Sequence, residues 1–195
     1  MSCIIDLLRH GEVDGGLCLG NASDPPLNAR GWSQMRDATS IDAGWQAVVS
    51  SPLQRCRAFA EELAARLDLP LRIDARLAEL GFGAWEGRPW TELYASHAEA
   101  LLRFQRTPGD NPAPGGEHFA DFEGRVRMAW AELGHQGENR QVLVVCHAGI
   151  IRAILRQVLE MPLTSLFRID VPHGGLTRLV CEADGTARLV FHRQP

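Results

Sequence analysis

The amino-acid sequence predicts an α/β fold, a three-layer α/β/α sandwich around a mainly parallel sheet. Two mostly apolar runs of strand length, Cys3–Leu8 and Val142–Val145, are typical of strands buried on both faces. Stretches with helical periodicity alternate with these runs and with shorter strand candidates. This alternation favours a sheet covered by helices on both sides.

In the N-terminal half, strands and helices alternate from the first residues onward. The elements predicted there are a strand at Cys3–Leu8, a loop at Val13–Leu27, a helix at Asn28–Ser40, a strand at Trp45–Val49, a helix that ends near Leu67 and a strand at Leu71–Ile73. Ser50, Ser51 and Pro52 mark the start of the second helix, with Ser as N-cap and Pro in the first turn. Arg55 and Arg57 lie two residues apart in that helix and point in different directions, so at most one should face a crevice.

The second half continues the alternation after a glycine-rich loop at Leu77–Gly87, which carries Glu79 and Glu86. The elements predicted there are helices at Arg88–Arg106, at His118–Leu133 and from Gly149 to the break at Met161 and Pro162, and strands at Val142–Val145, Leu166–Asp170, Leu176–Cys181 and Ala187–Phe191. The Pro- and Gly-rich segment Thr107–Gly116 is interpreted as an excursion within one core. We therefore expect a single domain over residues 1–195.

The composition of the chain argues against several classes of function. The hydrophobic content of 45% and the charged content of 23% are typical of soluble globular proteins, and the net charge of -4 provides no electrostatic surface for nucleic acid or an anionic membrane. The sequence has no apolar run near the roughly 18 residues of a membrane span and no signal-peptide pattern. Five cysteines without a Cys-x-x-Cys pair are interpreted as reduced thiols, and we expect a cytoplasmic location. All 20 basic side chains are arginine, which excludes a Schiff-base lysine.

Polar residues follow both of the buried strands. Arg9 and His10 follow the first strand, and His147 follows the strand at Val142–Val145. In open α/β sheets the ligand crevice lies beyond the carboxyl ends of the strands. A helix that starts after His147 adds unpaired backbone N–H groups and the positive end of its dipole. Together these groups predict a site for an anion the size of phosphate, although a surface cluster facing water is the alternative for the first motif alone.

Transfer of a phosphate monoester needs a nucleophile, cationic donors for the phosphoryl oxygens and an acid for the leaving alkoxide. Arginine binds phosphate through a planar fork, and a neutral histidine can attack phosphorus. A second histidine is expected to donate as imidazolium, and a carboxyl group beside phosphate should have a raised pKa that suits a general acid.

Four motifs, in this order, resemble the signatures of the histidine phosphatase superfamily, the phosphoglycerate-mutase-like group. They are Leu8–Glu12, Ser51–Arg55, Leu77–Gly87 and Val145–Gly149. The resemblance implies His10 as the nucleophile that becomes phosphohistidine, Arg9, Arg55 and His147 as the phosphate pocket, and Glu79 as the proton donor. Motif position favours Arg55 over Arg57 and Glu79 over Glu86. The resemblance also implies a small phosphate ester as substrate and no metal or other cofactor.

The sequence departs from the family pattern at three positions. Val13 and Gly16 stand where members often carry Thr and Asn, so a polar contact to phosphate is either missing or supplied by the backbone around Gly20. Ala148 replaces the first Gly of the commoner His-Gly-Gly. We expect Gly20 and Ala148 to bind substrate, with Ala148 still offering its backbone N–H.

Within the superfamily, three segments are similar to the α-ribazole-5′-phosphate phosphatases of cobalamin synthesis. They are Pro114–Phe119, Trp85–Gly87 and Glu160–Pro162. A broad-specificity or sugar-phosphate phosphatase is the alternative. Glu117 and His118 either reach over the pocket to recognise the leaving group or form the first turn of a helix. His173 is interpreted as a surface or structural residue, with a place near the site for residues 173–175 as the alternative.

Two other classes remain open. Residues 146–152 fit the Cys-x-x-Gly-x-x-Arg loop of cysteine-dependent phosphatases, in which the thiolate of Cys146 attacks and Arg152 completes the motif; a buried cysteine that closes a strand is the plainer interpretation. A phospho-ligand binding module without activity is the third hypothesis. The presence of both His10 and Glu79 argues against it.

Overall fold

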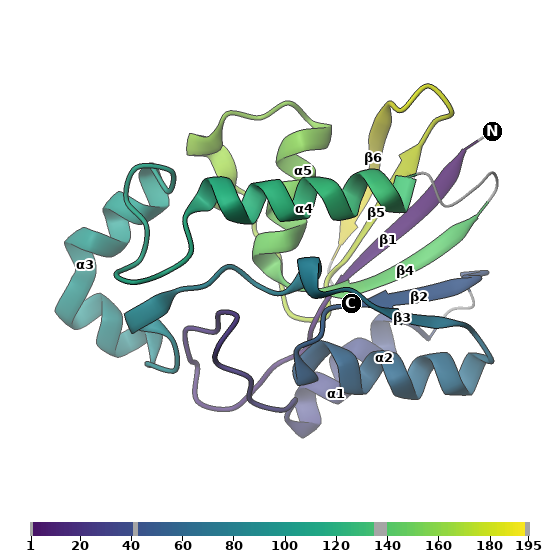
Figure 1. The fold of residues 1–195 in the computed structure, drawn as a ribbon. Coiled ribbons are helices and arrows are strands. Elements are labelled where there is room, and N and C mark those ends of the chain that lie inside the picture. The colour runs from purple at the N-terminus through teal and green to yellow at the C-terminus, as the bar shows by residue number, and fades with distance from the viewer. Residues whose placement is uncertain (1, 41–42, 135–139, 194–195) are drawn as a thin grey trace.

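A computed structural model describes residues 2–40, 43–134 and 140–193. Its centre is a six-stranded sheet with the order β3-β2-β4-β1-β5-β6 (Figure 1). The strands are β1 (Cys3–Arg9), β2 (Ala47–Ser50), β3 (Leu71–Ile73), β4 (Gln141–Cys146), β5 (Leu176–Cys181) and β6 (Ala187–Arg193). The first four are parallel, whereas β5 runs antiparallel to both β1 and β6. The predicted α/β fold with a mainly parallel sheet is confirmed.

Helices cover both faces of the sheet. They are α1 (Ala29–Ala38), α2 (Gln54–Leu67), α3 (Trp90–Arg106), α4 (Phe119–Gly134) and α5 (Ala148–Val158). In Figure 1, α1 and α2 lie on one side of the sheet and α4 and α5 on the other. Both faces of β1 and β4 are therefore buried, which explains why these strands are apolar along most of their length.

Alternation along β4 divides the core into two layers. Val142 and Val144 pack in the cluster that contains the buried residues of α4 and α5. Leu143 and Val145 point the other way, into the cluster that contains the buried residues of α1 and α2. Because successive side chains of a strand point to opposite faces, one short strand contributes to both layers.

The helix starts agree with the sequence except at α2. Asn28 caps α1 and accepts from the backbone N–H of Gly31. The predicted Ser cap of α2 is wrong, because the N-cap position is Leu53, which makes no side-chain cap bond. Instead Asp24, from the preceding loop, accepts from the backbone N–H of Gln54 at 2.9 Å. A tertiary contact thus stabilises this helix end.

One predicted strand is also wrong. Residues 166–170 lie in and after a 3₁₀ turn, Leu163–Arg168, where only Leu166 is buried. Leu166 joins the apolar cluster that includes residues of α3 and α5. The segment therefore packs on helices, and β5 takes the place beside β1 in the sheet. An apolar run of this length does not by itself distinguish a strand from a buried turn.

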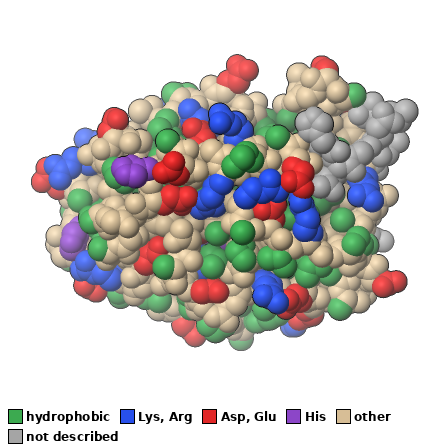
Figure 2. Space-filling model, in the orientation of Figure 1, with side chains coloured by type: hydrophobic (Ala, Val, Ile, Leu, Met, Phe, Trp, Pro, Cys, Tyr) green, Lys and Arg blue, Asp and Glu red, His purple; other side chains and the backbone are tan. Residues whose placement is uncertain are grey.

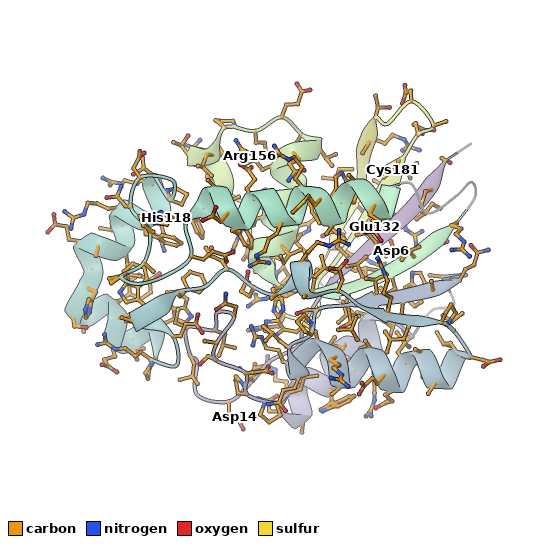
Figure 3. The ribbon with its side chains drawn as sticks, viewed as in Figure 1. Asp6, Asp14, His118, Glu132, Arg156 and Cys181 are labelled. Carbon is orange, nitrogen blue, oxygen red and sulfur yellow. The ribbon has the colours of Figure 1, made fainter. Side chains whose placement is uncertain are left out.

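The sheet holds one buried carboxylate, that of Asp6 on β1 (Figure 3). Its oxygens accept from Arg178 on the neighbouring β5 at 2.7 and 2.8 Å and from the indole N–H of Trp45 at 2.7 Å. These donors offset the cost of removing the charge from water.

The face shown in Figure 2 carries positive and negative side chains close together. On the outer side of α4, for example, Glu132 pairs with Arg72 and Arg76. Among the described residues, no helix is both long enough and apolar enough to span a membrane.

Candidate active site

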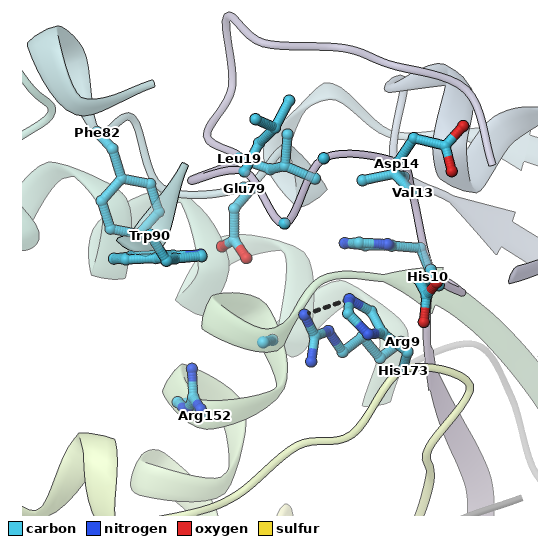
Figure 4. Close-up of a pocket in the computed structure, with 15 residues that line it drawn as sticks. Arg9, His10, Val13, Asp14, Leu19, Glu79, Phe82, Trp90, Arg152 and His173 are labelled. Atoms are coloured by element: carbon cyan, nitrogen blue, oxygen red, sulfur yellow. Dashed lines mark hydrogen bonds between the residues drawn. The ribbon is translucent and has the colours of Figure 1, made fainter. Parts of the chain in front are cut away.

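A cavity of about 410 Å³ opens beyond the carboxyl end of β1 and beside the start of α5 (Figure 4). Its polar lining includes Arg9, His10, Glu12, Asp14, Glu79, Arg152 and His173. Its apolar lining includes Val13, Leu17, Leu19, Phe82, Trp90 and Ala148. The cavity therefore lies at the edge of the sheet that the sequence predicts. Two arginines, Arg9 and Arg152, and two histidines, His10 and His173, form part of its wall.

His10 is buried at the end of β1. Its Nδ1 lies 2.8 Å from the carbonyl oxygen of Gly11 and donates to it, which leaves Nε2 without a proton. Burial, then the charges of Arg9 and Arg55, hold the pKa of His10 well below its ordinary value. His10 is thus neutral and carries a free nitrogen lone pair, as an attacking nucleophile requires.

Arg9 reaches past the end of β1 toward the segment before β5. It donates to the carbonyl oxygen of Val171, and its Nη2 lies 2.8 Å from Nε2 of His173. Burial lowers the pKa of Arg9 to about 10, so the guanidinium remains charged near neutral pH. Burial and the charge of Arg9 lower the pKa of His173 to about 4, so His173 accepts the hydrogen bond as a neutral ring. Of the two interpretations of His173, the structure favours the place near the site, because its ring lines the cavity.

Arg55 and Arg57 separate as the sequence predicts. The Arg55 side chain is fully buried and donates to the carbonyl oxygens of Gly20 at 2.9 Å and Ser23 at 2.8 Å. Arg57 is exposed and pairs with Glu61 along its own helix. Arg55 does not line the cavity; it lies beneath the loop at Val13–Leu27 and holds two of its carbonyl groups.

Gly20 packs within the loop and does not line the cavity. A Cβ at this position would lie 2.0 Å from Oε1 of Glu86. Glu86 accepts from the backbone N–H groups of Ala22, Ser23 and Phe82 at 2.7 to 2.9 Å. The expected backbone contact from Gly20 to substrate is absent from the cavity wall, because its carbonyl is bound to Arg55 and its Cα lies against Glu86.

His147 ends the turn between β4 and α5 and is fully buried. Its ring centre lies 5.2 Å from that of His10, and its Nε2 lies 2.7 Å from Oγ of Ser51. Burial, followed by the charge of Arg55, holds its pKa well below the ordinary value. The expected imidazolium is therefore not the form found without substrate; a bound phosphate dianion would favour it.

Glu79 is buried at the cavity wall, on the loop after β3. Its carboxylate accepts from the backbone N–H of Gly149 at 3.0 Å and from that of Leu80 at 2.9 Å. A Cβ at Gly149 would lie 2.2 Å from Oε1 of Glu79. Glycine in the first turn of α5 thus allows the carboxylate to approach the helix N-terminus, while the neighbouring Ala148 lines the cavity.

Glu117 and His118 do not line the cavity. Glu117 pairs with Arg125 at 2.8 Å and accepts from the backbone N–H of Gly81 at 3.1 Å. The carbonyl of His118 accepts the first hydrogen bonds of α4, at whose start Figure 3 places it. Both residues lie where the helix-start interpretation places them, and neither forms part of the cavity wall that would recognise a leaving group.

Cys146 is fully buried at the end of β4, and burial raises the pKa of its thiol well above the ordinary value. A thiolate nucleophile requires the opposite shift. The sequence reasoning tied Arg152 to that cysteine motif, yet Arg152 lines the cavity with His10. Arg152 lies four residues after Ala148 on the same face of the helix, and this spacing could have predicted its place near the site. Nothing in the sequence around Trp90 indicated that it would line the site.

Within residues 2–40, 43–134 and 140–193, no group of three or more His, Cys, Asp or Glu side chains is placed to hold a metal ion.

The fold and this arrangement define a class. Residues 5–193 match the family model of the histidine phosphatase superfamily (branch 1), and the chain belongs to that family. It is 30% identical to the adenosylcobalamin/alpha-ribazole phosphatase of Salmonella typhimurium over 96% of this chain and 95% of the relative. It is 36% identical to a bifunctional protein of Mycobacterium tuberculosis over 93% of this chain and 51% of that protein, so it spans about half the length of that curated relative. Mycobacterial glucosyl-3-phosphoglycerate phosphatase superposes with a TM-score of 0.86 at 25% identity, with 100% of each chain covered.

The buried histidines predict acid sensitivity of the fold. His10 and His147 are neutral when folded, whereas the unfolded chain binds protons below its ordinary histidine pKa of about 6.5. Stability is thus fully present above pH 6.5 and falls as the pH drops below it, by up to about 1.4 kcal/mol per pH unit for each such histidine. Urea unfolding between pH 8 and pH 5 measures this. His147→Gln should flatten the dependence and exposed His118→Gln should not; an equal slope in both variants would contradict it.

Proposed function

We propose that this chain is a phosphomonoesterase that acts through a phosphohistidine on His10. One observation carries the proposal: His10 is a neutral imidazole whose Nδ1 is bound to Gly11 and whose free side faces a cavity flanked by Arg9 and Glu79. Membership of the histidine phosphatase superfamily supports it.

The side chains of His10 and Glu79 can hydrolyse a phosphate ester in two steps. In the first, the Nε2 lone pair of His10 attacks phosphorus, the ester P–O bond breaks, and protonated Glu79 gives its proton to the leaving alkoxide. In the second, water attacks phosphorus, Glu79 takes a proton from it, and the P–N bond breaks with its electron pair returning to His10. Arg9 and the first turn of α5 would stabilise the charge on the phosphoryl oxygens, and the buried charge of Arg55 would act on them from beneath the loop.

Trapping the intermediate tests the nucleophile. Mixing the enzyme with p-nitrophenyl phosphate and quenching in alkaline denaturant should place one phosphoryl group on the His10 peptide, as detected by mass spectrometry. His10→Ala should lose both the adduct and turnover, because it removes the ring whose unprotonated Nε2 is available at the cavity. His118→Gln is the control that keeps both. Turnover with a phosphoryl group elsewhere would contradict the proposal.

The two arginines of α2 form a matched pair for a second test. Arg55→Ala should lower kcat/KM by about 10²-fold, because it removes a buried cation and the anchor of the Gly20 and Ser23 carbonyls. Arg57→Ala, two residues along the same helix, should stay within about twofold because its side chain is exposed. Steady-state kinetics with p-nitrophenyl phosphate measures both, and equal losses would refute the assignment of Arg55.

The substrate that we propose is α-ribazole 5′-phosphate, as in cobalamin nucleotide-loop synthesis. The likeness to the Salmonella enzyme and the apolar part of the cavity support this choice. A sugar-phosphate or broad-specificity phosphatase is the second candidate, favoured by the acidic side chains of Glu12 and Asp14, which can accept from hydroxyl groups. Rates of phosphate release from α-ribazole 5′-phosphate and from 3-phosphoglycerate should differ by about 10²-fold or more. Similar rates would leave the phosphatase standing and remove the cobalamin assignment.

We also propose that residues 1–195 act as one domain on small phosphate esters, without nucleic-acid or membrane partners, in the cytoplasm. The net charge of -4 and five buried, unpaired cysteines support this setting.

A further inference from the structure

Glu79 divides the cavity into two parts. Figure 4 places Arg9 and His10 on one side of its carboxylate and Phe82 and Trp90 on the other. A phosphoryl group beside His10, with its ester oxygen at Glu79, therefore directs the leaving group toward Phe82 and Trp90. Since Glu117 and His118 lie outside the cavity, recognition of the leaving group falls to residues that the sequence did not select.

The wall in that part of the cavity is aromatic and fixed. Trp90 packs edge-to-face on Phe82 with 6.4 Å between ring centres. The backbone N–H of Trp90 donates to the carbonyl oxygen of Gly16 at 3.1 Å, and Leu17 bridges to Pro89. The start of α3 is thereby tied to the loop that carries the other apolar wall residues. A wall of this kind favours a flat apolar group and disfavours sugar hydroxyls, which would lose water without gaining partners.

Arg152 adds a positively charged group to this part of the cavity. Its Nε donates to the carbonyl oxygen of Ile169 at 2.9 Å, and its guanidinium lies over the ring of Phe167 at 5.4 Å. These contacts fix the orientation of the side chain. Glu79 and Asp170 are its negatively charged neighbours, and among the described residues its Nη groups make no hydrogen bond or ion pair, so they remain available as donors in the cavity that Trp90 also lines. The leaving group thus meets an apolar wall and one directed donor.

We propose that Trp90 and Arg152 determine the specificity for the leaving group: a heteroaromatic ring packs on the Trp90–Phe82 wall, and Arg152 donates to an acceptor atom at the edge of that ring. The inference rests on the proposed phosphatase function and deepens it. A ring nitrogen with a free lone pair, such as the second nitrogen of a benzimidazole, satisfies both conditions.

Two esters with the same primary leaving oxygen test the wall. Ribose 5-phosphate lacks the ring of benzimidazole riboside 5′-phosphate, so the ratio of their kcat/KM values isolates ring recognition. Stacking on an aromatic side chain is worth about tenfold or more, and wild type should prefer the riboside by that factor. Trp90→Ala should bring the ratio close to one by lowering kcat/KM for the riboside. Trp90→Phe should retain most of the preference, and Leu102→Ala, at an exposed site on α3, should retain all of it.

A second pair of esters tests the donor. Indole riboside 5′-phosphate has the shape of the benzimidazole ester but lacks the acceptor nitrogen. Wild type should prefer the benzimidazole ester, and Arg152→Gln should reduce that preference by about tenfold, whereas exposed Arg57→Gln should preserve it.

The outcomes separate this inference from the proposed function. If wild type hydrolyses all three esters equally, or if Trp90→Ala lowers all of them by the same factor, the specificity assignment is overturned while the phosphatase stands. If wild type forms no adduct on His10 and releases no phosphate from any ester, the proposed function itself fails. If Trp90→Ala does not fold, Trp90→Leu, which retains apolar volume without a ring, decides the first test in its place.

Discussion

The parallel pairing of β1 with β4 is the constraint on which the site depends. Its register places Arg9 opposite Cys146, and the backbone N–H of His10 donates to the Cys146 carbonyl at 2.9 Å. Two segments almost 140 residues apart along the chain thereby deliver both site histidines to one edge of the sheet. The pairing lies at the centre of the sheet, where apolar burial on both faces makes a slip of register costly.

Two guanidinium groups, those of Arg9 and Arg55, lie at that edge. Arg9 is half-buried and Arg55 is fully buried, and both donate to backbone carbonyls. Arg55 also lies 3.5 Å from a carboxylate oxygen of Asp24, and the Nε atoms of both arginines have no partner among the described residues. Burial, and then these positive charges, hold the pKa values of His10 and His147 well below the ordinary value. Burial of charged groups costs stability, and the core on either side of β1 and β4 offsets that cost. An anionic ligand at this edge would relieve part of it.

Close contacts between carboxylates and glycines assemble the loops around this centre. Glu79 lies against Gly149, and Glu86 lies against Gly20; in each pair a Cβ on the glycine would meet the carboxylate. The two glutamates come from one loop but perform different tasks. Glu79 faces the cavity and binds the start of α5, whereas Glu86 gathers the backbone N–H groups of the loop at Ala22 and Ser23. Glycine at these positions sets how near two distant segments can approach.

The class of fold could be predicted from the sequence, because local patterns report burial. The apolar runs at β1 and β4, the helical periodicities and the polar residues at both strand ends all follow from short-range order. Helix geometry predicted that Arg55 and Arg57 point in different directions, and motif position favoured Arg55 as the site residue of the two. Tertiary structure alone decided the rest. The cap of α2 comes from distant Asp24, residues 166–170 pack on helices rather than in the sheet, and Glu117 turns to Arg125 instead of the cavity. Trp90 and Arg152 become neighbours of the site only through the packing of α3 and α5 around it. Such contacts join residues far apart in the chain, and periodicity within a segment carries no information about which distant segment it will meet.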